Sequence, residues 1–180
     1  MVEGALPTPV NIGQLKVKIE EARTANKNCL IWDQNGQTTT YFQYMEHLIE
    51  VGRMKVQVAM GAKTKDDVLA ELRKAQCNSS RQGKFLGVDL GNSILDLKED
   101  WKNEEIYGAA WTDHAAWRAN CNEMTSAEEK KTPMGDECSM FMFNKDFNLC
   151  IISKATTQEE FEAAVKGVPH IEDFMKVVIA

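Results

Sequence analysis

The 180-residue sequence lacks the features that mark several classes of protein. No run approaches the ~18 apolar residues that a membrane-spanning helix needs, so no membrane span is expected. The N-terminus, Met1 to Pro7, has no basic segment followed by an apolar one, so no secretory signal is expected either. Basic residues are in the minority, and the net charge is −6. A nucleic acid is therefore not the expected partner, because contacts to phosphates need a basic face.

Closely spaced cysteine or histidine pairs are also missing. The five cysteines are an odd number without a close pair, and Cys29 and Cys150 lie in apolar runs, where cysteine behaves as a small core residue. This usage indicates a reducing compartment, so we predict a cytoplasmic protein with five free thiols. His47, His114 and His170 are far apart in the sequence, so no metal site is expected.

The remaining composition is that of a globular protein. Hydrophobic residues make up 43% and charged residues 27% of the chain, which is enough for a sizeable core. The length fits one domain. We predict an N-terminal arm and helix over residues 1–27, followed by a single α/β domain over residues 28–180 with an insertion at about 91–146.

Apolar runs alternate with helical patterns along the chain. This alternation predicts a three-layer α/β fold with a mostly parallel five-stranded sheet and helices on both faces. The runs at 29–32, 84–89 and 147–153 are apolar on both faces, so they are predicted to be neighbouring central strands. The other expected strands are 55–60 and 176–179, and the apolar run 139–143 favours an antiparallel hairpin near 139–153.

Helices are expected between these strands. The pattern predicts helices over 11–27 and about 39–51, and Thr64 and Thr157 are expected to cap two more. Residues 76–82 are polar and are expected to form a connection.

The polar turn after the first strand is the main basis for predicting a function. The order of a strand, a polar turn, a helix, and later a strand ending in aspartate resembles a P-loop NTPase domain over roughly residues 28–180. Gly36-Gln37-Thr38 stands at the family's Gly-Lys-Thr positions, so Gln37 replaces the lysine that binds the β- and γ-phosphates.

The run from Phe85 to Asp89 matches the apolar strand whose aspartate holds Mg²⁺ in that family, without the acidic residue that often follows. The resemblance implies a degenerate site that binds a nucleotide weakly or not at all. Its residues would be Gly36, Gln37, Thr38, Thr39, Asp89 and Ser153. The alternative is an ordinary doubly wound domain whose strands happen to end in polar loops.

A second local resemblance competes for Asp89. The segment from Leu86 to Ser93 is similar to the first phosphate motif of the actin and sugar-kinase superfamily. That motif normally begins the domain, and its two lobes need more chain than follows here.

Two further clusters are weaker candidates. The acidic residues between Asp96 and Glu105 are interrupted by Lys98 and Lys102, which is typical of a solvated face. His114 lies between two tryptophans, where a packing role is expected.

Together these patterns predict a non-catalytic, P-loop-like domain that serves as a protein-interaction or scaffold module, with no cofactor. The candidate partner-facing residues are Trp101, Tyr107, Trp111 and Trp117, because such aromatics are enriched at interfaces; the alternative is that they belong to the core. The rival hypothesis is a nucleotide-binding enzyme for NTP hydrolysis or phosphotransfer. It would use Thr38 or Thr39 and Asp89 on Mg²⁺, with Lys84 or an external residue supplying positive charge.

Overall fold

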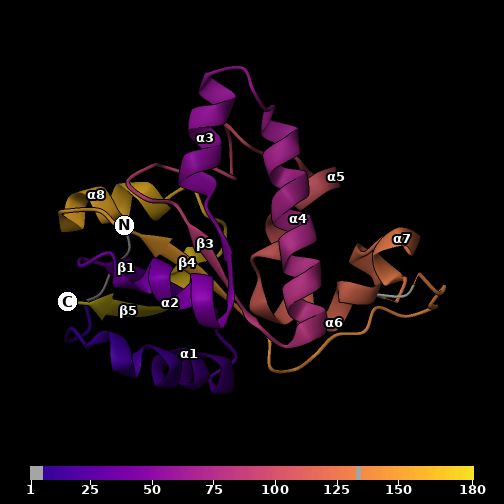
Figure 1. Ribbon diagram of the computed structural model, residues 1–180, viewed down its shortest axis with the longest axis horizontal. Coiled ribbons are helices and arrows are strands. Elements are labelled where there is room, and N and C mark those ends of the chain that lie inside the picture. The colour runs from indigo at the N-terminus through magenta and orange to yellow at the C-terminus, as the bar shows by residue number, and fades with distance from the viewer. Residues whose placement is uncertain (1–5, 133–134) are drawn as a thin grey trace.

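The computed structural model describes residues 6–132 and 135–180, which fold around a five-stranded parallel sheet (Figure 1). The strand order is β2-β3-β4-β1-β5. The strands are β1 (Cys29–Asp33), β2 (His47–Ile49), β3 (Phe85–Asp89), β4 (Asn148–Ser153) and β5 (Met175–Ile179). This is the three-layer α/β fold that the sequence predicts.

Helices cover both faces of the sheet. One face packs against α1 (Leu15–Thr24) and α2 (Gln37–Met45), which share a core cluster with Ile31 and Cys150. The opposite face packs against other helices and includes Leu30 and Ile151. These helices are α3 (Val51–Ala59), α4 (Lys65–Gln82), α6 (His114–Met124) and α8 (Gln158–Val165). Successive strand residues thus point to opposite cores, as the period of a strand requires.

Short elements complete the fold. They are the 3₁₀ turns η1 (Ile12–Gln14), η2 (Ala109–Trp111) and η3 (Ile171–Asp173), and the one-turn helices α5 (Glu104–Tyr107) and α7 (Ala127–Lys130). Within the described ranges, no helix is both long and apolar enough to cross a membrane.

The three central strands are confirmed. β4 pairs in parallel with β3 on one side and with β1 on the other. All three are buried along their whole length, which explains why their sequences lack a polar face.

The predicted helix caps are also confirmed. The Thr64 side chain accepts a hydrogen bond from the Asp67 N–H, and the Asp67 carboxylate accepts one from the Thr64 N–H. Thr157 and Glu160 make the same reciprocal pair at the start of α8. Each pair satisfies N–H groups that a helix start would otherwise leave unpaired.

The strand predicted at 55–60 is wrong, because these residues belong to α3. Val51, Met54 and Val58 lie at helical spacing and pack against the core, whereas Val56 is 57% exposed. The second strand is instead His47–Ile49, inside the stretch that the sequence pattern assigned to a helix. The apolar residues in this stretch fit both the period of a strand and that of a helix. Pairing with β3 makes His47–Ile49 a strand.

The antiparallel hairpin near 139–153 is also wrong. Residues 139–146 contain no strand, and β4 begins only at Asn148. Both edges of β4 are already paired, with β3 and β1, so no edge remains for an antiparallel neighbour. Phe141 is buried against Trp117 instead.

Residues 76–82 are not a connection but the last part of α4. Gln76, Ser79 and Ser80 are fully buried there, and each has a hydrogen-bond partner from another element. A polar stretch can form a buried helix face when its groups are satisfied in this way.

The N-terminal segment is part of the same core. Val10 forms a bridge with Ile179 at the edge of β5, and α1 buries Leu15, Ile19 and Ala22 against the sheet.

Candidate functional site

The carboxyl ends of β1, β3 and β4 meet at one edge of the sheet, because the strands are parallel and adjacent. Asp33 ends β1, Asp89 ends β3, and Lys154 follows β4. Ligands in open α/β sheets bind outside such carboxyl ends. This edge is therefore the first place to look for a site.

Asp33 organises the turn between β1 and α2. Its carboxylate accepts hydrogen bonds from the N–H groups of Asn35 (3.3 Å), Gln37 (3.2 Å) and Thr38 (2.8 Å). Gly36 has φ of +70°, a left-handed conformation that glycine adopts without strain, and this lets the turn close around the carboxylate. Asp33 is 1% exposed, so this negative charge is buried at the start of α2.

Asp89 organises the neighbouring strand end. One of its carboxylate oxygens accepts a hydrogen bond from the Lys154 ammonium (2.8 Å) and from the Thr39 hydroxyl (3.5 Å). The other oxygen accepts the Gly91 N–H at 2.8 Å. Asp89 is buried, and the partly exposed Lys154 pairs with it. Because the two charges are opposite, the pair leaves no net charge at this strand end.

The predicted nucleotide-site residues are only partly brought together. Gly36 and Gln37 are exposed at the surface of the turn, and Thr39 and Asp89 touch. The Thr38 hydroxyl is fully buried and has no hydrogen-bond partner among the described residues. The Ser153 hydroxyl is also buried, and it accepts a hydrogen bond from the Ala155 N–H at 3.4 Å.

Lys84 lies at the wrong end of the sheet to supply positive charge to this edge. It precedes β3, whereas Asp89 ends that strand, and its ammonium donates to the Met45 carbonyl at 2.9 Å. Lys154 is the basic residue that the fold places beside Asp89.

The four aromatic side chains predicted to face a partner are buried. Trp101, Tyr107, Trp111 and Trp117 are 2–4% exposed and belong to the large core cluster. Trp111 packs between Tyr107 and Trp117, with ring centroids 5.4 Å and 4.5 Å away. The prediction that these rings are exposed is wrong, and the core alternative holds. The insertion is otherwise rich in polar residues, and these rings supply its hydrophobic anchor.

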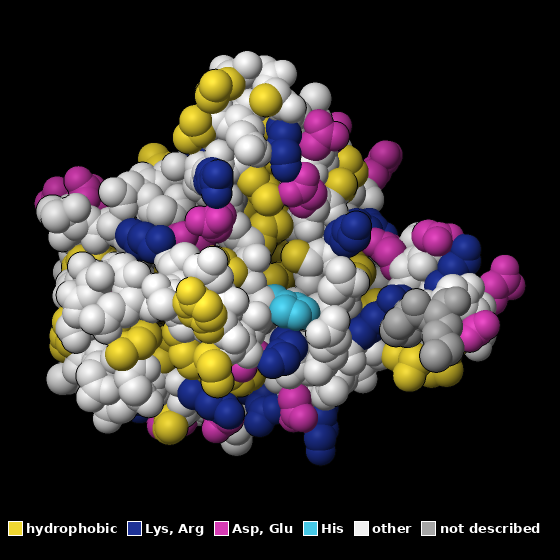
Figure 2. All heavy atoms as spheres, in the orientation of Figure 1, with side chains coloured by type: hydrophobic (Ala, Val, Ile, Leu, Met, Phe, Trp, Pro, Cys, Tyr) yellow, Lys and Arg dark blue, Asp and Glu magenta, His cyan; other side chains and the backbone are white. Residues whose placement is uncertain are grey.

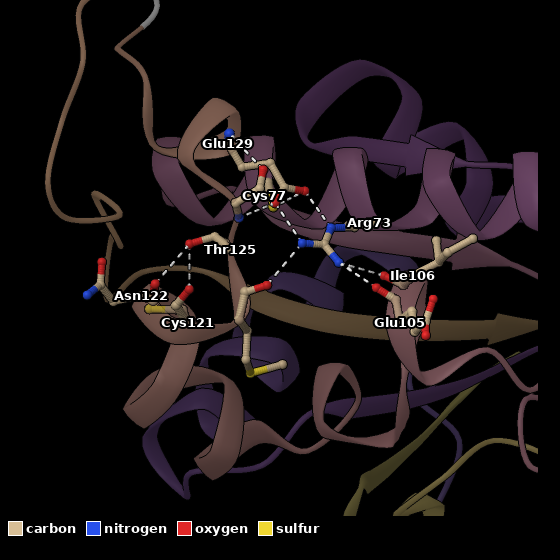
Figure 3. Close-up of polar contacts among 10 residues, drawn as sticks. Arg73, Cys77, Glu105, Ile106, Cys121, Asn122, Thr125 and Glu129 are labelled. Atoms are coloured by element: carbon tan, nitrogen blue, oxygen red, sulfur yellow. Dashed lines mark hydrogen bonds and ion pairs between the residues drawn. The ribbon is translucent and has the colours of Figure 1, made fainter.

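A dense polar network holds the insertion against α4 (Figure 3). The Arg73 guanidinium donates hydrogen bonds to both carboxylate oxygens of Glu129, at 2.6 Å and 2.7 Å. It also donates to the carbonyl oxygens of Glu105 (3.2 Å), Ile106 (3.0 Å) and Met124 (3.0 Å). One side chain therefore joins three segments of the insertion to α4, using the planar fork that distinguishes arginine from lysine.

The Arg73 network is not a nucleophilic site, although Cys77 lies beside Glu129 (Figure 3). Burial, reinforced by the Glu129 carboxylate, raises the pKa of Cys77 to about 12. The thiol therefore stays protonated at neutral pH, and the protonated form is a poor nucleophile. The network stabilises the fold.

A cavity of about 760 Å³ lies along the free edge of β2. We call it the β2 groove. Its floor includes the β2 residues 47–49, and its walls carry Gln43 and Glu46 from the end of α2, Arg53 and Gln57 from α3, and Asn78 and Gln82 from α4. Figure 2 shows hydrophobic side chains at the bottom of a hollow between α3 and α4.

His47 lies in the β2 groove, where its Nδ1 is 2.8 Å from the Ser79 hydroxyl. Burial and the nearby Lys84 lower the pKa of His47, which favours the neutral ring. Ser79 is fully buried, so this pair orients the imidazole and offers no accessible nucleophile. Within the described ranges, no three His, Cys, Asp or Glu side chains are placed to hold a metal ion.

Sequence reasoning missed Asp33, Lys154 and the β2 groove. Asp33 and Lys154 both follow apolar strand runs directly, and that position was the available signal. No sequence pattern indicates the groove, because the pattern predicts a helix over the residues that form its floor.

Comparison of the chain with known protein families, with curated proteins and with solved structures found no match.

Proposed function

We propose that this chain is a non-catalytic, P-loop-like α/β domain that serves as a protein-interaction or scaffold module in an intracellular assembly. The observation that carries the proposal is the turn before α2. The N–H groups of Gln37 and Thr38, which a phosphate loop directs at a phosphate, are bound by the Asp33 carboxylate. The protein's own carboxylate takes the place of a bound anion.

Charge at the sheet edge supports the same proposal. Lys154 is paired with Asp89, and Gln37 supplies no fixed charge in the turn. A triphosphate could reach these N–H groups only by displacing the Asp33 carboxylate, and the negative charge of that carboxylate would repel it. The helix dipole contributes roughly 0.3–2 kcal/mol to anion binding. A change from millimolar to micromolar affinity needs about 4 kcal/mol, which is more than the helix dipole supplies.

One observation favours the rival function, a nucleotide-binding enzyme. Thr39 and Asp89 lie within 3.5 Å of each other, although they are far apart in the sequence. A hydroxyl and a carboxylate so placed are a pair that Mg²⁺ accepts in nucleotide sites. In that case Lys154, not Lys84, would supply the local positive charge.

Calorimetric titration with ATP, with and without Mg²⁺, tests the proposal. We expect millimolar or weaker affinity and no hydrolysis in the wild type. Gln37→Lys tightens binding only if the turn can open towards phosphate. Micromolar, Mg²⁺-dependent binding that is lost in Thr39→Ala and Asp89→Ala, together with measurable hydrolysis, would establish the enzyme instead. The control is Thr40→Ala, which changes an exposed threonine on the same helix and leaves either result unchanged.

A further inference from the structure

The two edges of the sheet are closed to different degrees. At the β5 edge, Val10 donates a hydrogen bond to the Val178 carbonyl (2.9 Å) and accepts one from the Ala180 N–H (3.3 Å). Pro7 and Pro9 precede it, and proline has no N–H with which to extend a sheet. At the opposite edge, β2 pairs with β3 alone within the described ranges. Its outward main-chain groups therefore have no strand beside them.

The short length of β2 limits unspecific pairing, but the strand itself carries none of the residues that proteins use to block an open edge. Its sequence is His47-Leu48-Ile49, with no proline, lysine or other charge. Instead of being covered, this edge opens into the β2 groove, whose volume of about 760 Å³ lies within the ordinary range for ligand sites.

We infer that the β2 groove binds an extended segment of a partner protein, which adds to β2 as a sixth, edge strand of the sheet. This inference rests on the proposed function and names the class of partner. Main-chain hydrogen bonds to the outer side of β2 give affinity, and alternate side chains of the segment contact the groove walls.

The short length of β2 argues against a second copy of the chain paired through this edge. Three strand residues span roughly 10 Å. Pairing two such edges would bury far less than the ~800 Å² per partner that a stable dimer needs. The α3–α4 pair stands out from the sheet in Figure 1, and both helices line the β2 groove, so they bound the space that an added strand would occupy.

Charges in the groove define the segment further. Glu50 pairs with Arg53 (3.8 Å), and Lys63 pairs with Glu71, so these charges are balanced within the protein. Glu46 accepts the Phe85 N–H at 3.0 Å and forms no salt bridge with a described residue, although the Lys84 ammonium donates to the neighbouring Met45 carbonyl. The complementary occupant is a segment of alternating apolar residues that also carries one lysine or arginine.

Selection from a phage-displayed library of random peptides tests the inference, with the strongest binder then synthesised and titrated by fluorescence anisotropy. We expect extended, alternating sequences with a basic residue and no central proline. Asn78→Trp, which places a bulky ring on the groove wall, weakens binding at least about tenfold. The matched control is Asn120→Trp, the same change at an exposed position of α6 outside the groove. It leaves binding unchanged.

Two further readouts separate strand addition from other binding. N-methylation of the alternate peptide nitrogens that face β2 weakens binding at least about tenfold. N-methylation of the nitrogens that face away leaves binding unchanged. Amide exchange of residues 47–49 slows in the complex. Glu46→Gln weakens binding of the basic peptide but not of its glutamine analogue.

Several results overturn the inference. They are failure to select any peptide, selected helical peptides, equal binding by both tryptophan variants, or a dimer in solution that closes the groove. None of these results changes the outcome expected for the calorimetric titration with ATP. Peptide failure without nucleotide binding rejects the groove alone, whereas micromolar nucleotide binding rejects the proposed function.

Discussion

The carboxylate of Asp33 holds three main-chain N–H groups at the start of α2. The same donors could hold an external anion, so one side chain decides whether this turn is a structural cap or a binding site. Two oxygens shared among three donors also fix the turn in one conformation. The conformation of this turn therefore depends on one carboxylate.

Asp33→Ala should destabilise the protein by about 1–3 kcal/mol, because it removes a helix cap and leaves several N–H groups unpaired. Urea unfolding of the wild type and the variant measures this loss. Gln34→Ala, which changes the exposed neighbour, should stay within ~0.5 kcal/mol of the wild type. Equal midpoints for the wild type and Asp33→Ala would show that the carboxylate does not hold the turn.

His114 makes stability depend on pH. Burial, together with the adjacent Arg118, lowers its pKa from 6.5 to about 4, and Arg118 donates a hydrogen bond to its Nε2 at 2.9 Å. The unfolded chain therefore binds a proton between these values that the folded protein does not bind. The stability that this neutral ring contributes is fully present above pH 6.5 and is lost as the pH falls towards about 4.

In His114→Gln, the decline in the free energy of unfolding between pH 6.5 and about 4 should become shallower than in the wild type. Denaturant unfolding at several pH values measures the two slopes. The matched control is Ala115→Gln, an exposed neighbour on the same helix without an ionisable group, and it should keep the wild-type slope. Parallel curves for wild type and His114→Gln would contradict the assignment.

The packing of α2 on β3 depends on a glycine. A Cβ added at Gly87 would lie 2.7 Å from the Phe42 ring and 3.0 Å from the Ile152 side chain. Real Cβ atoms do not approach other atoms this closely, so the helix could not keep its present distance from the sheet. The close contact between these elements is therefore built into one strand position.

Gly87→Ala should destabilise the protein by about 1–3 kcal/mol through overpacking. Phe42→Leu makes room, so the double variant should lose less than the sum of the two single losses. Urea unfolding of all four proteins in a double-mutant cycle measures the coupling. Simple additivity would mean that the strain lies elsewhere.

Burial over the whole molecule governs the reactivity of its thiols. Cys29, Cys77, Cys121 and Cys150 are at most 6% exposed, and only Cys138 is partly exposed. Burial also raises the pKa of Cys121 and Cys150, which keeps these thiols protonated.

Titration of the native protein, prepared without reductant, should find about one rapidly reacting thiol, and titration in denaturant should find all five. Cys138→Ser should abolish the rapid reaction and leave four thiols in denaturant. Recovery of three or fewer thiols from the denatured wild type would reveal a disulfide.

The sequence by itself determined the α/β class, the three central strands and the helix caps. Strand runs such as residues 29–32 and 149–152 are apolar on both faces, and a parallel sheet covered by helices buries both faces of such strands. Capping pairs such as Thr64 with Asp67 act within one turn, so neighbouring residues suffice to predict them.

Tertiary structure alone decided the features that require partners distant in the chain. His47–Ile49 is a strand because β3 lies beside it, and Trp111 is buried because α4 and the insertion enclose it. The sequence shows that Asp33 ends a strand, but it does not show that its carboxylate caps the turn that follows. Lys154 meets Asp89 only when β3 and β4 align. The hydrophobic period of a segment records how much of it is buried, whereas the identity of the neighbour that buries it is set by the packing of the whole chain.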